Sequence, residues 1–299
     1  MKKLLILGGS GFFGNSIVDY GVEKKLIKHK IDEIYIVSRS KSLKKKKFKH
    51  IKINYITSKI TNIKKIPIID YVIYCLKSED TKISNNNFKY FLKLIKNFPK
   101  KPKILFTSSG AVYGKNRIKK SEDSIIDYKK IEKLSGYKKN YALEKVYMEN
   151  KFKELGKLNY NVSIARCFNF LGKHILNSKQ AVGDMISDGL KKKKIILNTT
   201  GNIYRGYMSA DDLVHWLIII LKNSNKNCPI YNVGSDKVIN LRMLAKKIAK
   251  IFNKKLRLKK LNKLQSDYYV PSINKAKKLL KLKVSINLND SLNSFIKLR

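Results

Sequence analysis

Residues 4–14 limit the fold more strongly than any other stretch of the chain. Four apolar residues, Leu4–Leu7, come before a glycine-rich run, and apolar residues recur at helical spacing after it. This order predicts a buried strand, a tight turn and a helix. Such a turn exposes backbone N–H groups to a pyrophosphate, and the N-terminus of the helix favours the same anion. The predicted dinucleotide contacts in this stretch are Gly8, Ser10, Gly11, Phe12, Phe13 and Gly14.

The glycine spacing is G-x-x-G-x-x-G, which differs from the G-x-G-x-x-G of many dinucleotide-binding folds. Glycines also mark ordinary turns, so the triplet is a weak signal by itself. Its position between a predicted strand and a predicted helix supplies the context that the motif requires. We therefore interpret the start of the chain as part of a cofactor-binding unit.

The end of the second predicted strand bears on the choice of cofactor. Residues 33–37 form this strand, which ends at Ser38 and Arg39. In a dinucleotide fold an acidic residue here binds the ribose 2′-hydroxyl of NAD, whereas an arginine accommodates the 2′-phosphate of NADP. The segment has an arginine and no acid, which favours NADP(H), with NAD(H) as the alternative. An exposed arginine without a ligand is the other interpretation, and the scarcity of arginine in this lysine-rich chain weighs against it.

Strands and helices alternate along the first half of the chain. Strands are predicted at 51–56, 71–76 and 103–107, with a helix at about 87–97. This alternation is typical of an α/β fold with a doubly wound parallel sheet, in which ligands bind at the carboxyl ends of the strands. Cys75 lies at such an end and is a predicted cofactor contact.

Hydroxyl, phenol and ammonium groups follow in an order that suits acid–base catalysis. Ser108 and Ser109 come directly after the strand at 103–107, where they are placed to contact a substrate. The run at 140–148 favours a helix, on which Tyr141 and Lys145 lie on one face. A phenol has a pKa of about 10 in water, and a nearby cation lowers it by favouring the phenolate. We therefore predict that Lys145 lowers the pKa of Tyr141 toward neutrality.

The chain resembles the extended short-chain dehydrogenase/reductase superfamily, which contains nucleotide-sugar epimerases, dehydratases and reductases. The motifs that carry the resemblance are spread over most of the chain in the superfamily's order. They are Gly8/Gly11/Gly14, residues 108–114, Tyr141-x-x-x-Lys145, residues 165–169 and Arg205-Gly206-Tyr207-x-x-x-x-Asp212-Leu213. A narrower similarity, to the CDP-abequose synthase-like and dTDP-4-dehydro-6-deoxyglucose reductase-like branch, rests on residues 168–172, 181–186, 204–208, 231–235 and 269–272.

The resemblance implies a role for each matching residue. Tyr141 is expected to exchange a proton with the sugar oxygen, and Ser109 to hydrogen-bond the same oxygen. Lys145 is expected to support the phenol and to bind the nicotinamide ribose. Asn169 and Arg205 are expected to contact the diphosphate of the substrate, which an arginine can hold through two hydrogen bonds.

The resemblance also implies an architecture. We expect a Rossmann-like doubly wound parallel sheet with a smaller C-terminal α/β lobe for the substrate. The NAD(P)-binding domain would comprise residues 1–165 together with 203–228. The nucleotide-sugar-binding lobe would comprise 166–202 and 229–299. Many such relatives are dimers, so a homodimer is the expected assembly.

The net charge of +45 raises the question of a nucleic-acid or membrane partner. The basic residues are nearly all lysine, and lysine, asparagine and isoleucine are frequent throughout, a pattern that also fits a genome rich in A and T codons. The most apolar run, 213–221, has about half of the roughly 20 residues that a membrane span needs. Three irregularly spaced cysteines favour neither a disulfide framework nor a metal site. We expect a cytoplasmic protein without a metal, a membrane span or a nucleic-acid partner.

The predicted function is the NADPH-dependent reduction of the 4-keto group of a nucleotide-linked 4-keto-6-deoxyhexose, for the synthesis of surface polysaccharide or O-antigen. An NAD-dependent C4 epimerase of nucleotide sugars is the first alternative, because it would use the same three side chains without net redox change. A non-catalytic Rossmann-like protein that binds nucleic acid is the second alternative. The presence of Ser109, Tyr141 and Lys145 together argues against it.

Overall fold

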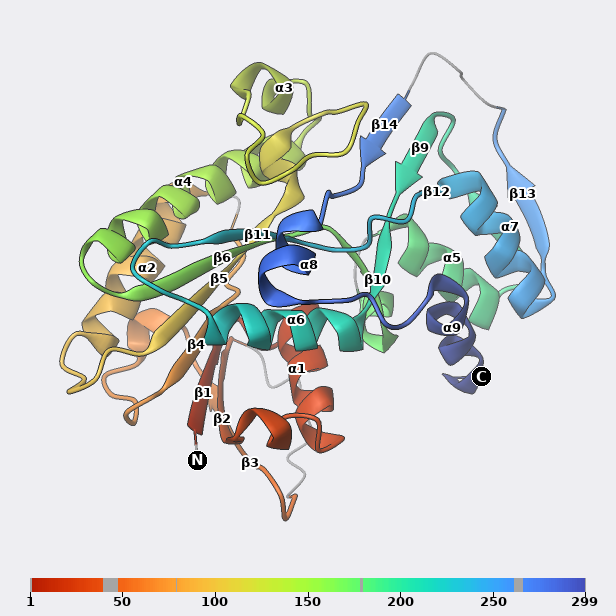
Figure 1. Cartoon of the computed structure of the whole chain (residues 1–299). Coiled ribbons are helices and arrows are strands. Elements are labelled where there is room, and N and C mark those ends of the chain that lie inside the picture. The colour runs from red at the N-terminus through yellow and green to blue at the C-terminus, as the bar shows by residue number, and fades with distance from the viewer. Residues whose placement is uncertain (1, 40–47, 79, 178–179, 261–265, 299) are drawn as a thin grey trace.

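A seven-stranded parallel sheet forms the larger part of the molecule (Figure 1). The computed structural model describes residues 2–39, 48–78, 80–177, 180–260 and 266–298. From one edge to the other, the strands are β11 (Ile230–Val233), β6 (Asn161–Cys167), β5 (Lys103–Ser109), β4 (Tyr71–Tyr74), β1 (Lys2–Leu7), β2 (Ile31–Ser38) and β3 (Lys52–Thr57).

Helices cover both faces of this sheet. On one face, α1 (Phe12–Val22) and α6 (Ala210–Lys222) pack against the strands, and on the other face α2 (Thr81–Ile95) and α4 (Tyr137–Lys157) do so (Figure 1). The expected Rossmann-like doubly wound fold is thereby confirmed.

The central strand β1 shows why the sequence folds in this way. Leu4 and Ile6 belong to the apolar cluster that contains residues of α1 and α6. Leu5 and Leu7 belong to the cluster that contains residues of α2 and α4. Because successive side chains of a strand point to opposite faces, an uninterrupted apolar run is buried only when both faces are covered.

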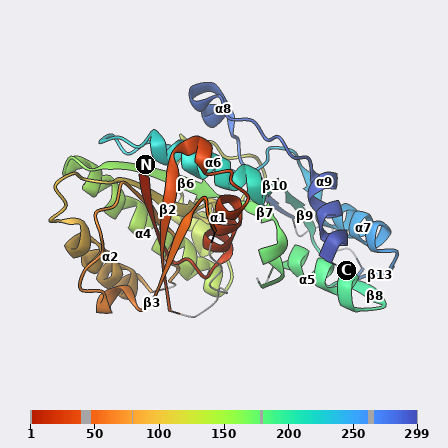
Figure 2. The ribbon, with the colours of Figure 1, turned by 90° about the horizontal axis from the view of Figure 1, so that it is seen from below.

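The rest of the chain builds smaller sheets and helices beside the carboxyl ends of the large sheet (Figure 2). A third apolar cluster forms the core of this part. Its sheets are β7 (Asn169–Leu171) with β10 (Tyr207–Ser209), β8 (Lys194–Leu197) with β13 (Lys255–Leu258), and β9 (Asn202–Arg205) between β12 (Ile239–Asn240) and β14 (Ser266–Tyr269). Its helices are α5 (Ala181–Lys191), α7 (Leu241–Phe252) and α9 (Leu288–Asn293), while α3 (Tyr128–Glu132) and α8 (Asn274–Leu280) lie closer to the large sheet.

Most predicted elements are present, with shifted ends. The helix after the glycine loop ends at Val22, and two residues later Lys24 adopts a left-handed conformation with a φ of 63°. The helix that carries Tyr141 is longer than expected and extends to Lys157. Within residues 115–139, which the sequence shows only as a polar stretch, the short helix α3 begins after Asp127, whose carboxylate caps it.

The place of residues 230–233 in the structure differs from the expected division of the chain into two lobes. It was assigned to the smaller lobe, yet β11 pairs in parallel with β6 and forms an edge of the large sheet. The apolar residues Tyr231 and Val233 are buried in the same cluster as α6, which explains this position.

Two further observations concern membranes and metals. None of the helices in the described part of the chain has the length and hydropathy that crossing a bilayer requires. Among the same residues, the histidine, cysteine and acidic side chains form no group of three or more that could hold a metal ion.

Candidate active site

The glycine loop joins the ends of three neighbouring strands. The N–H groups of Gly8 and Gly9 both donate hydrogen bonds to the carbonyl oxygen of Val37 in β2, over 3.0 and 3.1 Å. Gly8 has a φ of 92°, and a Cβ added there would lie 2.6 Å from the carbonyl oxygen of Cys75, after β4. A side chain at Gly8 is therefore excluded both by its backbone conformation and by close packing.

The outer side of this loop is open. Gly11 is exposed, and among the described residues a Cβ added there would meet, within 4 Å, only the carbonyl oxygen of Gly8, at 3.7 Å. Gly11 also precedes α1, and no side chain in the described part of the chain caps that helix. The first turn of a helix has backbone N–H groups without partners inside the helix, so this open glycine corner fits the pyrophosphate of a dinucleotide.

Phe12 and Phe13, two further predicted cofactor contacts, are the first residues of α1. Their rings pack against Phe170 of β7, with centroid distances of 6.3 and 5.8 Å. The rings are therefore directed into the protein and fix the first turn of α1. Ser10 is exposed, and its carbonyl oxygen accepts a hydrogen bond from the Asn15 side chain, which holds the turn in place.

Gly11 and Gly14 offer a matched test of this arrangement. A Cβ at Gly14 would lie 2.3 Å from Cα of Gly9, so we expect Gly14→Ala to lower the free energy of unfolding by about 1–3 kcal/mol through overpacking. Gly11→Ala should leave the unfolding free energy nearly unchanged, because the backbone at Gly11 is extended and alanine adopts that conformation without strain. Gly11→Ala should nevertheless weaken dinucleotide binding. Urea unfolding and a fluorescence titration with NADPH measure the two effects, and equal unfolding curves for the two variants would contradict the prediction.

The predicted cofactor contacts outside the loop lie at neighbouring strand ends. Ser38 is the last residue of β2, and Arg39 follows it as an exposed residue in a bend. Val37 accepts the hydrogen bonds of the glycine loop, and Ser38 and Arg39 follow it directly in the chain. Both residues therefore lie near the loop. Cys75 lies beneath the loop, where its thiol donates a 3.0 Å hydrogen bond to the carbonyl oxygen of Leu7. Burial raises the pKa of Cys75 to about 12, so its sulfur stays a neutral thiol.

The three predicted catalytic side chains meet at the carboxyl end of β5. Ser109 is the last residue of that strand, and its hydroxyl hydrogen-bonds Tyr141. The ammonium nitrogen of Lys145 lies 5.5 Å from the ring centre of Tyr141 and donates a hydrogen bond to the carbonyl oxygen of Leu76 over 3.4 Å. The i, i+4 spacing on α4 thus brings the phenol and the ammonium together beside the strand end.

The prediction that Lys145 lowers the pKa of Tyr141 is wrong for this arrangement. Burial raises the pKa of Tyr141 above its ordinary value, and the hydrogen bond from Ser109 opposes this only in part. Burial also lowers the pKa of Lys145, which a neighbouring carboxylate, Glu144, counteracts. The lysine charge is shared with an anion, so it does not outweigh the effect of burial on the pKa of Tyr141.

Ser108 was predicted to contact the substrate, and its position does not support that role. Ser108 is 2% exposed, and its hydroxyl donates a 2.6 Å hydrogen bond to Glu149 of α4. Glu149 in turn forms a two-point ion pair with Arg166 of β6, over 2.9 and 2.7 Å. Adjacent side chains of a strand point to opposite sides, so Ser108 joins this buried network while Ser109 faces the site.

The predicted diphosphate contacts come from the smaller part of the molecule. Asn169 begins β7, and its amide donates a 3.4 Å hydrogen bond to the carbonyl oxygen of Gly206. Arg205 ends β9 and donates a 2.6 Å hydrogen bond to the carboxylate of Asp267 in β14. A ligand anion would therefore compete with Asp267 for the guanidinium group.

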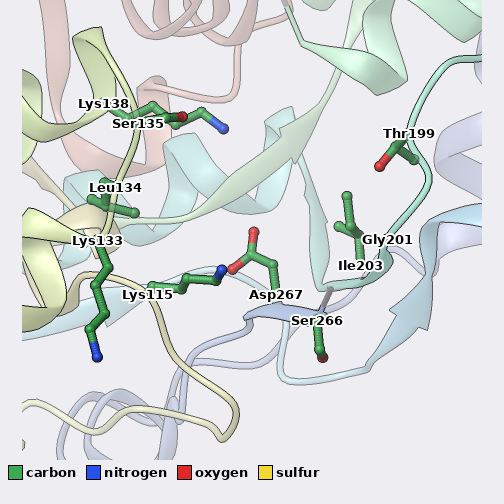
Figure 3. Close-up of a pocket in the computed structure, with 10 residues that line it drawn as sticks. All are labelled: Lys115, Lys133, Leu134, Ser135, Lys138, Thr199, Gly201, Ile203, Ser266 and Asp267. Carbon is green, nitrogen blue, oxygen red and sulfur yellow. The ribbon is translucent and has the colours of Figure 1, made fainter. Parts of the chain in front are cut away.

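A pocket of about 250 Å³ lies next to this ion pair (Figure 3). In the close-up, the side chain of Lys115 reaches toward the carboxylate of Asp267. Cationic side chains beside Arg205 suit an anionic ligand. The residues that line the pocket are Lys115, Lys133, Leu134, Ser135, Lys138, Thr199, Gly201, Ile203, Ser266 and Asp267.

Tyr269 is a site residue that the sequence did not reveal. It comes from β14, yet its hydroxyl lies 3.2 Å from the hydroxyl of Ser109. Its ring packs on Phe168, with 4.7 Å between the centroids, and lies 5.7 Å from the guanidinium of Arg205. Burial raises the pKa of Tyr269, so the phenol is neutral. No local pattern indicates such a contact, because 160 residues separate the two hydroxyls.

Comparison with known proteins agrees with this architecture. The model of the NAD dependent epimerase/dehydratase family matches residues 4–234. The dTDP-D-glucose 4,6-dehydratase of Dictyostelium discoideum is 29% identical to this chain over 84% of the chain's residues. The chain spans 62% of the length of that dehydratase. UDP-glucuronic acid decarboxylase 3 of Arabidopsis thaliana is 23% identical over 97% of this chain and 86% of its own length.

A solved structure gives the same result for the fold. UDP-glucose 4-epimerase from Thermotoga maritima, solved with UDP-glucose, superposes with a TM-score of 0.76 at 18% identity and covers 99% of this chain and 97% of that one. The family match includes the glycine loop, the strand end with Ser109 and the helix with Tyr141 and Lys145. The chain belongs to the NAD dependent epimerase/dehydratase family.

Proposed function

We propose that the protein uses NADPH to reduce the 4-keto group of a nucleotide-linked 4-keto-6-deoxyhexose. The observation that carries this proposal is the meeting of Ser109, Tyr141 and Lys145 at the end of β5, beside the open glycine corner. A bound nicotinamide in its reduced form would supply the hydride. The NADP preference rests on Arg39 at the end of β2.

The raised pKa of Tyr141 suits the reducing direction. As a hydride adds to C4, the electron pair of the carbonyl bond moves onto oxygen, which then takes a proton. A phenol whose pKa lies above its ordinary value keeps that proton at neutral pH and can deliver it. Ser109 would hydrogen-bond the same oxygen, and the charge of Lys145 would stabilise the phenolate that remains.

The residues after Ser109 favour a single proton-transfer centre. Gly110 and Ala111 follow it directly, and neither side chain can exchange a proton. Elimination of water from a sugar needs a further acid and base in addition to the group at C4. At these two positions the chain thus supplies no additional acid or base for a dehydration.

The remaining parts of the proposal concern substrate binding and domain roles. Asn169 and Arg205 would bind the diphosphate, supported by the lysines of the adjacent pocket. Residues 1–165, α6 and β11 would bind the cofactor, whereas residues 203–209, expected in the same domain, belong to the small sheets of β9 and β10. The remaining smaller part would bind the nucleotide sugar.

The proposal is tested with purified protein, NADPH and either dTDP- or CDP-4-keto-6-deoxyglucose. We expect the absorbance of the reduced nicotinamide to fall as the ketone is reduced. No consumption of NADPH with either substrate would overturn the reductase proposal.

A C4 epimerase is the second candidate, because the fold also matches UDP-glucose 4-epimerase. It would interconvert a nucleotide hexose and its C4 epimer without net consumption of cofactor. Incubation with UDP-glucose and NAD, followed by separation of the two epimers, distinguishes it from the reductase.

Arg39 provides the test of cofactor choice. We expect Arg39→Asp to lower the preference for NADPH over NADH by about 10- to 100-fold, the effect of losing a hydrogen bond between charged groups. The ratio of kcat/KM with the two cofactors measures this. Arg257→Asp makes the same charge change at an exposed position of β13 and should leave the ratio as it was. An unchanged ratio in Arg39→Asp would contradict the NADP assignment.

A further inference from the structure

A buried carboxylate lies directly beside the lysine of the site. Glu144 precedes Lys145 on α4, and the two side chains are 2% and 3% exposed. Glu144 Oε2 lies 3.5 Å from Lys145 Nζ. Glu144 Oε1 accepts a 2.6 Å hydrogen bond from the hydroxyl of Ser84 on α2. The acid–base roles given above to Ser109, Tyr141 and Lys145 leave this carboxylate without a function.

The contacts of Glu144 orient it toward the ammonium group. Ser84 is buried and holds one carboxylate oxygen from the neighbouring helix. The other oxygen, Oε2, is buried and has no hydrogen-bond partner within the described structure. A buried carboxylate oxygen without a hydrogen bond is unfavourable unless a nearby positive charge compensates it, and Lys145 is that charge.

The Tyr141 ring has a second cation beside it, the Lys77 ammonium at 5.5 Å from the ring centre. The groups that face Glu144 or Lys145 from the strand ends, in contrast, are uncharged at neutral pH. Tyr74 of β4 faces Glu144, while Cys75 and Cys167 face Lys145 from the ends of β4 and β6. Burial raises the pKa of all three, to about 12 for Cys75. Tyr141 stays protonated for the same reason. Among the described residues that face the Lys145 ammonium, the opposite charge thus comes from Glu144.

We propose that Glu144, held by Ser84, is a positioning residue that keeps Lys145 protonated beside Tyr141. This inference rests on the proposed function, in which reduction needs both the proton of Tyr141 and the charge of Lys145. A negative charge favours the protonated form of each group, because it attracts an ammonium and disfavours a phenolate. Glu144 therefore extends the activity toward alkaline pH.

The first test is the pH dependence of kcat/KM for NADPH oxidation. Glu144→Gln keeps the shape and can keep the contact with Ser84, but it removes the charge. We expect the alkaline limb to move to lower pH by about one unit, a tenfold change in proton affinity. Glu144→Asp retains a carboxylate, so the alkaline limb of its kcat/KM profile should lie closer to that of the parent protein. An equal loss of activity at every pH in Glu144→Gln would overturn the proposal, since it would indicate a structural role alone.

The second test needs no substrate and therefore separates this inference from the proposed function. In Glu144→Gln, a buried Lys145 without its anion has a folded-state pKa below that of the unfolded chain. The unfolded state then binds more protons, so stability rises with pH until the ordinary lysine pKa is reached. The double variant Glu144→Gln/Lys145→Met lacks the lysine and serves as the reference. The unfolding free energy of Glu144→Gln, minus that of the double variant, should increase as the pH rises from neutral. A pH-independent difference between these two variants in urea unfolding would overturn the proposal.

Discussion

Replacing Tyr141 by phenylalanine should lower kcat for NADPH oxidation by about 10²–10⁴-fold, the usual contribution of a positioned acid–base group. The substitution removes the hydroxyl that Ser109 hydrogen-bonds and leaves the ring, over which the Lys145 ammonium lies at 5.5 Å. Affinity for NADPH should change little, because the glycine loop is unaltered. Steady-state kinetics and a fluorescence titration with NADPH separate the two effects.

Tyr147→Phe is the matched control, because it removes a phenol hydroxyl from the same helix. Tyr147 lies against the cluster that α2 and α4 share, where its ring contacts the ammonium of Lys151. We expect its kcat to remain close to that of the parent. A Tyr141→Phe protein that retains more than a tenth of the parent kcat would exclude Tyr141 as the proton donor.

The largest loss of stability is expected from Arg166→Met. Arg166 and Glu149 are 3% and 1% exposed, and removing one partner of such a pair leaves an uncompensated buried charge. The expected loss is about 3–5 kcal/mol in the free energy of unfolding. Arg166 also donates a 2.9 Å hydrogen bond to Tyr113, so β5, α4 and the segment after Ser109 lose a common anchor. Urea unfolding followed by circular dichroism measures the effect.

The double variant Arg166→Met/Glu149→Met is the control. It removes both charges, and buried ion pairs replaced by apolar residues of similar size often retain their stability. We expect it to recover more than half of the loss. A double variant as unstable as Arg166→Met alone would indicate that packing around the site, rather than charge compensation, is what the pair provides.

The parts of the site that the sequence predicted share one property: each depends on residues close together in the chain. The glycine loop needs a strand, a turn and a helix in succession, and Tyr141 and Lys145 need one helical turn. Regular geometry converts these spacings into contacts. The position of Ser109 follows in the same way from the end of a parallel strand.

The contacts that the sequence did not predict join distant segments. Ser84 and Glu144 meet because α2 and α4 pack side by side, and Ser109 meets Tyr269 across 160 residues. The pKa of Tyr141 was mispredicted for the same reason. Its burial and the anion beside Lys145 depend on packing, which the spacing of Tyr141 and Lys145 does not encode.

The strand β14 has a consequence for how a ligand would bind. Asp267 and Tyr269 are two residues apart, so their side chains lie on the same face of the strand. Asp267 holds the guanidinium of Arg205, and Tyr269 holds the hydroxyl of Ser109. A nucleotide sugar would displace one contact with its diphosphate and the other with its sugar oxygen. The two ends of the ligand would then bridge Arg205 and Ser109 in place of β14, and either fragment alone would bind far more weakly than the whole molecule.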